Sequence, residues 1–102
     1  MAATNYNVLT PTGYQAITAT SSTSGGCTIP SPGTGATASN FAIFVVETNA
    51  VRWRDDGTSP TAAVGMPLAA GSTLEYDSPL NGIRFITQAG SATIHASYYR
   101  AE

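Results

Sequence analysis

The sequence predicts an all-β fold: a single-domain antiparallel β-sandwich of jelly-roll or immunoglobulin-like type. Glycine and proline interrupt the chain too often for helices, which need uninterrupted stretches of about 10–12 residues. The short stretches between them are rich in aromatic and β-branched residues, which favour strands. A chain of 102 residues can bury only one modest core, which excludes a two-domain enzyme.

The N-terminal third is expected to hold one strand between two irregular segments. Residues 14–20 alternate weakly and predict the first strand, so residues 1–13 are interpreted as an extended N-terminal arm and 14–102 as the sandwich domain. Residues 21–38 form a long Ser/Gly/Thr/Pro loop, and loops beyond about 12–15 residues are uncommon in compact domains. Two interpretations stay open: a floppy surface loop, or a segment that becomes ordered against a neighbouring chain.

Residues 41–47 (FAIFVVE) carry apolar side chains at alternate and at intervening positions. This pattern predicts a central strand covered on both faces. A helix is the alternative, because Phe41, Phe44 and Val45 also fit one helical stripe. We favour the strand, because Ile43 and the two valines lose rotamer freedom in a helix.

The next strand is predicted at residues 51–54, with Val51 and Trp53 facing inward and the two arginines outward. The Asp-Gly pair at 56–57 predicts a turn after it. A short strand is expected at residues 73–76, followed by a turn over 78–82.

The C-terminal segment is predicted to be a hairpin. Its strands are residues 83–88 and 91–99, with a turn at positions 89 and 90. Alternation along the second strand separates two faces. The sequence assigns Ile94, Ala96 and Tyr98 to one face, and Thr93, His95, Ser97 and Tyr99 to the other.

Charged residues are scarce, at 10% of the chain against about 25% in an average protein. Four arginines without any lysine cannot form the cationic stripe that nucleic-acid binding requires. No run of about 18 apolar residues and no charged-then-apolar leader is present, so neither a membrane span nor a secretion signal is expected. A surface of hydroxyls, Ala and Gly loses its water at low cost, which favours extensive contact with other subunits.

The inventory of chemically active side chains predicts no catalytic, metal-binding or cofactor-binding residues. His95 is the only imidazole, and a cupin-like metal site needs at least two histidines and a carboxylate. Cys27 has no base near it in sequence, cannot form an intrachain disulfide, and pairs with His95 only if the fold brings them together. The Asp55-Asp56-Gly57 sequence lacks the remaining ligands of a calcium loop and is interpreted as a turn.

Two further patterns resemble parts of ligand-binding sites. The letters GTGATA at 33–38 match a dinucleotide-binding turn, but neither a strand before them nor a helix after them is predicted. Aromatic side chains could form a sugar-binding platform, for which Tyr98 and Tyr99 are the candidates and Tyr76 is also available. Trp53 is expected to face the core beside Val51 instead.

Residues 51–100 combine an aromatic/Arg strand, an Asp-Gly-Thr-x-Pro-Thr turn, a Gly-x-Pro-Leu-x-x-Gly segment and a strand ending in two tyrosines. In this respect the chain resembles small all-β virion proteins encoded in the structural-gene clusters of tailed bacteriophages. The residues that carry the resemblance are Trp53, Arg54, Asp56, Gly57, Thr58, Pro60, Thr61, Gly65, Pro67, Leu68, Gly71, Tyr98 and Tyr99.

The resemblance implies a non-enzymatic structural role, which agrees with the scarcity of charge. It implies a capsid decoration (cement) protein that bridges neighbouring shell subunits, made in the bacterial host cytoplasm and located on the capsid surface. The expected partners are the major capsid protein or other virion proteins and further copies of the chain, with a trimer favoured. The alternatives are a head-fibre, neck or tail accessory protein, or a carbohydrate- or receptor-binding module.

Overall fold

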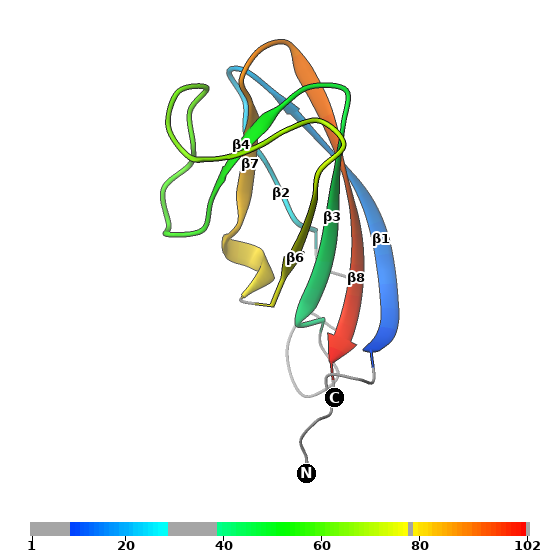
Figure 1. The fold of residues 1–102 in the computed structure, drawn as a ribbon. Helices are drawn as coiled ribbons and strands as arrows, with labels where there is room; N and C mark the ends of the chain where they lie inside the picture. Colours follow the sequence, from blue (N-terminus) through cyan, green and yellow to red (C-terminus); the bar gives the residue numbers. More distant parts are fainter. Residues whose placement is uncertain (1–8, 29–38, 78, 102) are drawn as a thin grey trace.

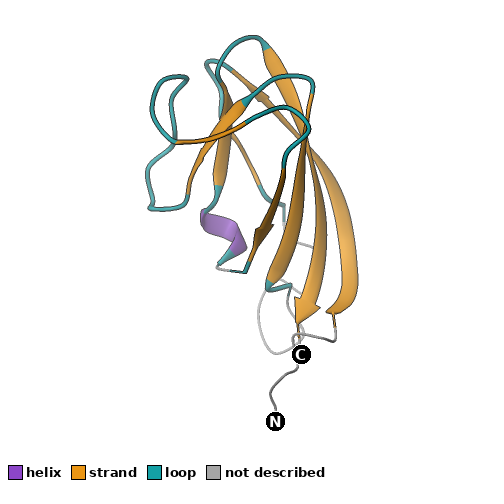
Figure 2. Cartoon of the chain, in the orientation of Figure 1, coloured by secondary structure: helices purple, strands orange, loops and turns teal. Residues whose placement is uncertain are grey.

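The computed structural model describes residues 9–28, 39–77 and 79–101, and over these the chain forms two four-stranded antiparallel sheets (Figures 1 and 2). A single turn of 3-10 helix, η2 (Leu80–Gly82), lies between β6 and β7. The strands are β1 (Leu9–Thr20), β2 (Gly25–Gly26), β3 (Phe41–Glu47), β4 (Val51–Arg54), β5 (Met66–Leu68), β6 (Thr73–Tyr76), β7 (Arg84–Thr87) and β8 (Ser91–Ala101).

The strand order is that of a jelly roll. The first sheet has the order β1-β8-β3-β6 and the second the order β2-β7-β4-β5. One long antiparallel hairpin accounts for four of the pairings: β1–β8, β2–β7, β3–β6 and β4–β5. Two further pairings, β8–β3 and β7–β4, fold this hairpin into two sheets. Of the two sandwich types predicted, the jelly roll therefore matches.

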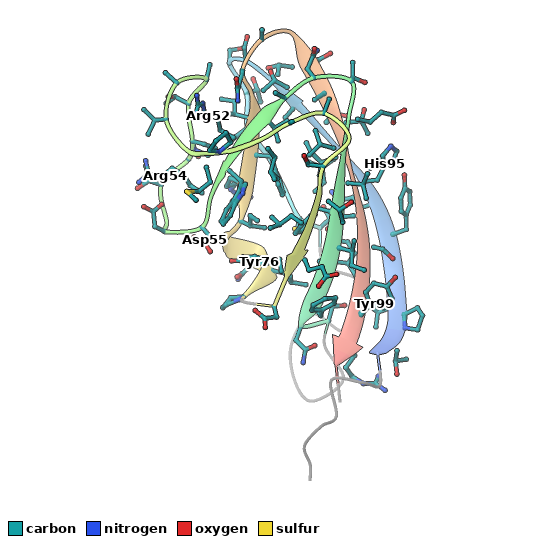
Figure 3. All side chains as sticks on the ribbon, in the orientation of Figure 1. Arg52, Arg54, Asp55, Tyr76, His95 and Tyr99 are labelled. Atoms are coloured by element: carbon teal, nitrogen blue, oxygen red, sulfur yellow. The ribbon has the colours of Figure 1, made fainter. Side chains whose placement is uncertain are left out.

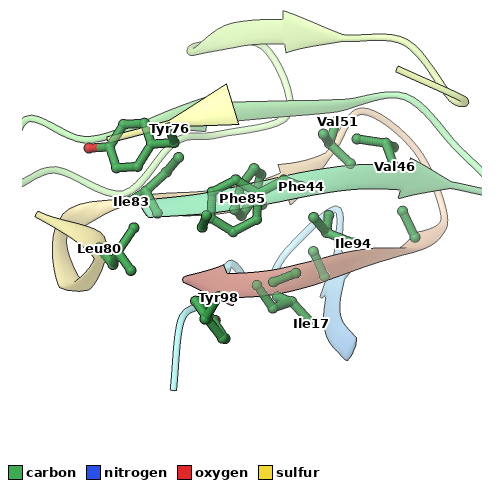
Figure 4. Packing of buried hydrophobic residues seen from close by; sticks show 14 residues of the cluster. Ile17, Phe44, Val46, Val51, Tyr76, Leu80, Ile83, Phe85, Ile94 and Tyr98 are labelled. Atoms are coloured by element: carbon green, nitrogen blue, oxygen red, sulfur yellow. The ribbon is translucent and has the colours of Figure 1, made fainter. Parts of the chain in front are cut away.

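The core lies between the two sheets (Figure 4). The rings of Phe44 on β3 and Phe85 on β7 meet edge to face with their centroids 5.0 Å apart, and both residues are fully buried. The Tyr76 ring packs against Phe44 from β6 at 6.3 Å. Ile94, Ala96 and Tyr98 are also buried, so the predicted inward face of the last strand is confirmed.

Several strands were predicted with the bounds that the structure has. Residues 41–47, 51–54 and 73–76 are β3, β4 and β6, which excludes the helix considered for the first of them. The expectation that residues 41–47 are covered on both faces is wrong. Ala42, Phe44 and Val46 are buried, whereas Val45 is 37% exposed. β3 lies in the interior of its sheet, but each sheet of a two-layer sandwich has only one face against the core.

The predicted C-terminal hairpin is also wrong, although both strands exist. β7 pairs with β2 and β4 in the second sheet, whereas β8 pairs with β1 and β3 in the first. The tight turn at Gly90, where φ is 69°, therefore leads from the second sheet to the first at the surface of the sandwich. Sequence alternation gives the inward face of each strand, and that face is the same whether the turn stays within a sheet or crosses between sheets.

The N-terminal arm and the long loop are shorter than predicted. Residues 9–13 belong to β1, which pairs with β8 from Leu9↔Ala101 to Thr20↔Ser91 around a bulge near Pro11. The predicted loop 21–38 contains β2, which pairs with β7. Residues 1–8 and 29–38 of these two segments lie outside the described residues.

The loop after β4 folds back over the outer face of the second sheet. The Arg52 side chain holds this loop against the sheet through two hydrogen bonds. Its Nε donates to the Ala62 carbonyl at 3.1 Å and its Nη1 donates to the Gly65 carbonyl at 3.0 Å. Gly65 has a φ of 144°, and an added Cβ would lie 3.0 Å from the Arg52 Cβ. The loop ends in β5, a strand that the sequence did not predict because it contains Pro67; as an edge strand it tolerates a missing donor.

Candidate functional site

The structure places the predicted candidate residues in three separate regions. His95 lies on the outer face of the first sheet, Trp53 beside the loop after β4, and Cys27 against the core. Within the described ranges, no group of three or more His, Cys, Asp or Glu side chains could hold a metal ion. In the same ranges, no helix has the length and apolar character needed to cross a membrane.

The outer face of the first sheet carries more apolar surface than a solvated sheet face requires. Val45 is 37% exposed and Tyr14 is 63% exposed. The rings of Phe41 and Tyr99 lie across the β3–β8 pair with their centroids 6.1 Å apart. We call this surface the outer sheet face; its members are Tyr14, Phe41, Ile43, Val45, Glu47, Thr73, Glu75, Thr93, His95, Ser97 and Tyr99.

The prediction that His95 is a solvent- or interface-facing strand residue is confirmed, and the structure adds two partners. A hydrogen bond of 2.6 Å joins its Nδ1 to the Tyr14 hydroxyl, and Nε2 lies 2.5 Å from Oε1 of Glu47. The Tyr14 ring also stacks on the imidazole at 6.0 Å. These contacts run diagonally between β1, β8 and β3, so sequence reasoning could find them only once the strand register was known.

The His95 arrangement satisfies polar groups on the sheet face. Both imidazole nitrogens are occupied, and the Glu47 carboxylate, 63% exposed, has a partner within the same face. A polar group that is already hydrogen-bonded within its own chain costs less to cover than one bonded to water. His95 and Glu47 are therefore hydrogen-bonded within the outer sheet face itself.

The second region is a groove of 510 Å³ beside the indole of the chain's single tryptophan (Figure 3 labels Arg54 and Asp55 next to it). We call it the Trp53 groove; its lining residues are Trp53, Arg54, Asp55, Asp56, Val64, Gly65 and Met66. The Trp53 ring meets Tyr76 edge to face at 6.2 Å. Trp53 does pack against the core, as predicted, but it is only half-buried and its remaining surface lines the groove.

The two aspartates of the predicted turn have protein partners. Arg54 donates from Nε to Oδ1 of Asp56 at 3.0 Å and from Nη2 to Oδ2, and these bonds hold the pKa of the Asp56 carboxyl below its usual value. Asp55 accepts a hydrogen bond of 2.9 Å from the Tyr76 hydroxyl. Gly57 has a φ of 91°, as a glycine turn requires. These contacts support the turn interpretation.

The sugar platform considered for Tyr98 and Tyr99 is wrong. Tyr98 is fully buried in the core, whereas Tyr99 belongs to the outer sheet face. Successive residues of a strand point to opposite sides of the sheet, so the two rings cannot share one surface. The aromatic side chain that does line a groove is Trp53.

Cys27 lies next to a polar network centred on Gln15. The Gln15 Oε1 accepts from the Tyr98 hydroxyl at 2.5 Å and from the Thr28 amide at 2.7 Å, while Nε2 donates to the Gly26 carbonyl at 3.3 Å. Through these hydrogen bonds, Gln15 of β1 connects the segment after β2 to the first sheet. A Cys27–His95 pair is not formed, because the thiol packs against the core and the imidazole lies on the outer sheet face.

The unfolding free energy is expected to fall as the solution becomes alkaline. Burial raises the pKa of the Cys27 thiol, although the Tyr98 hydroxyl and Arg84 oppose this, and burial likewise raises the pKa of Tyr98. Unfolded Cys and Tyr ionise near about pH 8.5 and 10, so above these values the unfolded state releases protons that the folded state retains. Each group then lowers stability by at most about 1.4 kcal/mol per pH unit.

Urea unfolding at pH 7, 9 and 10 measures this loss. The Cys27→Ala variant serves as the control. It should not show the loss of unfolding free energy that begins at about pH 8.5, but it should keep the loss at higher pH that is due to Tyr98. Equal slopes against pH for the wild type and the variant would show that the thiol ionises alike in both states.

Comparison of the chain with protein-family models, with curated proteins and with solved structures gave no significant match.

Proposed function

We propose that this chain is a non-enzymatic structural protein of a bacteriophage virion, a capsid decoration protein that bridges neighbouring shell subunits. The observation that carries the proposal is the outer sheet face, where Phe41, Ile43 and Val45 occupy the water-facing positions of a strand central to its sheet. A solvated sheet face normally alternates to polar residues. Three successive outward positions of β3 depart from that pattern, and exposed apolar side chains grouped in this way mark surfaces that contact other proteins.

The electrostatics of the chain support the same proposal. Only ten of 102 residues are Asp, Glu or Arg, and the formal net charge is −2. On the outer sheet face, the Glu47 carboxylate is bonded to His95. A partner that covers this face meets two carboxylates, Glu47 and Glu75, so few ions must be stripped of water, which is the main cost of burying a charged surface.

The expected partners are the major capsid protein and further copies of the chain, in a trimer. Most homo-oligomers have closed cyclic symmetry, and in a trimer each contact joins two different surfaces of neighbouring copies. An interface of about 800 Å² per partner is enough for stable attachment. Head-fibre, neck and tail positions are alternatives within the same structural role, and the symmetry of the assembly distinguishes them.

The test is co-sedimentation with shells assembled from the major capsid protein of the same phage. Val45→Arg places a charge in the centre of the outer sheet face and is expected to weaken attachment at least about tenfold, a loss of about 1.4 kcal/mol. Val64→Arg is the matched control, because Val64 is also exposed, at 50%, but lies in the loop over the second sheet. The control is expected to attach like the wild type.

The arm is tested separately by removing residues 1–8. The truncation must stop there, because Leu9 onward pairs with β8 and a longer deletion would damage the sheet.

A chain that stays monomeric in sedimentation equilibrium at all concentrations and does not bind shells would contradict the proposal. Equal attachment of the Val45→Arg and wild-type chains would reject the outer sheet face as the docking surface.

A further inference from the structure

We propose that the Trp53 groove is a binding site for a neutral oligosaccharide. This site lies by the second sheet and shares no residue with the outer sheet face, so it is independent of the structural role proposed above. Its volume of 510 Å³ lies within the range of about 300–1,000 Å³ that is usual for small-molecule sites.

The walls of the groove combine an aromatic ring with exposed apolar side chains. Trp53 is half-buried, and Val64 and Met66 beside it are 50% and 57% exposed. The face of an indole carries the negative part of the ring quadrupole. The axial C–H groups of a pyranose carry small positive charges, so a sugar ring that stacks on the indole gains both apolar contact and electrostatic attraction.

On the polar side of the groove, the Arg54 guanidinium, which donates hydrogen bonds, lies next to the Asp56 carboxylate, which accepts them; we call this pair the fork. Arg54 and Asp56 form two parallel hydrogen bonds, and each side chain keeps exposure to solvent, at 27% and 55% respectively. Adjacent sugar hydroxyls each donate and accept, so a pair of them can bond to the guanidinium and the carboxylate together. Arg54 and Asp56 neutralise each other, and the Asp55 carboxylate, bonded to the Tyr76 hydroxyl, disfavours an anionic ligand, so a neutral saccharide suits the groove better than an acidic one.

The groove is held rigidly, which lowers the ordering cost of binding. Tyr76 packs against the Trp53 ring and donates to Asp55, so the indole and the turn are fixed by one side chain. On the opposite wall, Arg52 bonds to the Gly65 carbonyl and holds the loop before Met66.

A second hollow adjoins the same turn and extends the polar surface. It measures 200 Å³, and its lining consists of Gly57, Thr58, Ser59, Asn81, Gly82 and Arg84. Asp56 and Gly57 are consecutive, so the two hollows are neighbours on the surface. The hydroxyl and amide groups there suit further sugar units, which is why an oligosaccharide fits better than a single sugar.

The test uses the intrinsic fluorescence of Trp53, which is the chain's only tryptophan and therefore reports on the groove alone. The intact chain is titrated with lactose, cellobiose, chitobiose and their longer homologues. At least one series is expected to shift the emission saturably with a Kd of about 1 mM or tighter, and the longer homologue should bind more tightly.

Two variants probe the fork. Asp56→Asn removes the carboxylate, and Arg54→Lys keeps the charge but loses the planar fork; each is expected to weaken binding about tenfold. Asp77→Asn is the matched control, since Asp77 is exposed and does not line the groove. Thermal melts check that all three variants remain folded.

Three results would overturn the proposal. The first is no saturable emission change with any saccharide, and the second is wild-type affinity in both fork variants. The third is a saturable response to a proline-rich peptide without a response to saccharides, which would assign the groove to a polypeptide ligand. None of these results depends on whether the chain attaches to capsids.

Discussion

Replacing Phe44 with alanine is expected to lower the free energy of unfolding by about 3–5 kcal/mol. The ring is fully buried and packs edge to face on Phe85 and against Tyr76, so its removal leaves a cavity between the sheets. A domain of this size has only about 5–15 kcal/mol of stability in total, so the melting temperature should fall by about 15–30 °C. Calorimetry or urea unfolding measures the loss.

Val45→Ala is the control for this prediction. Val45 is the next residue of β3, but it faces the outer side of the sheet and is 37% exposed. Its replacement should cost less than about 1 kcal/mol, because little apolar surface is uncovered. Losses of similar size in the two variants would contradict the assignment of inner and outer faces.

Replacing Gln15 with alanine is expected to cost about 1–3 kcal/mol. Gln15 accepts the hydrogen bond from the buried Tyr98 hydroxyl and three further bonds connect it to residues 26–28. Without the amide, the hydroxyl keeps only the weakly accepting Cys27 sulfur as a side-chain partner. Urea unfolding of the variant gives the cost directly.

The double variant Gln15→Ala, Tyr98→Phe separates the two contributions. Removing the hydroxyl as well takes away the group left without a good partner, so the double variant should be more stable than the sum of the single losses predicts. Additive losses would mean that the hydrogen bond between Gln15 and Tyr98 contributes nothing to stability.

The elements that the sequence predicted well are short runs bounded by turn residues. β3, β4 and β6 have the predicted bounds because each is a short run between glycine, proline or asparagine turns. β2 was missed because its two glycines carry no side-chain pattern. The sheet to which each strand belongs was also beyond prediction, because the Gly90 turn joins β7 of the second sheet to β8 of the first.

The candidate surfaces were predictable only in part. The outward orientation of His95 follows from alternation along β8, but its contacts with Tyr14 and Glu47 come from strands 81 and 48 residues away. The Trp53 groove depends on the loop that Arg52 holds against the second sheet. Nothing in a one-dimensional pattern relates an arginine to carbonyl groups 10 and 13 residues later.

The pairing of Leu9 with Ala101 has a consequence for how the chain is made. Of the described strands, β1 is synthesised before all the others and its hydrogen-bonding partner β8 after them (Figure 1 shows the two side by side). The first sheet therefore cannot close until β8 has been synthesised, and contacts between distant residues slow folding into the range of about milliseconds to seconds. During that interval the nascent β1 presents an unpaired backbone, which makes early synthesis the stage most exposed to aggregation.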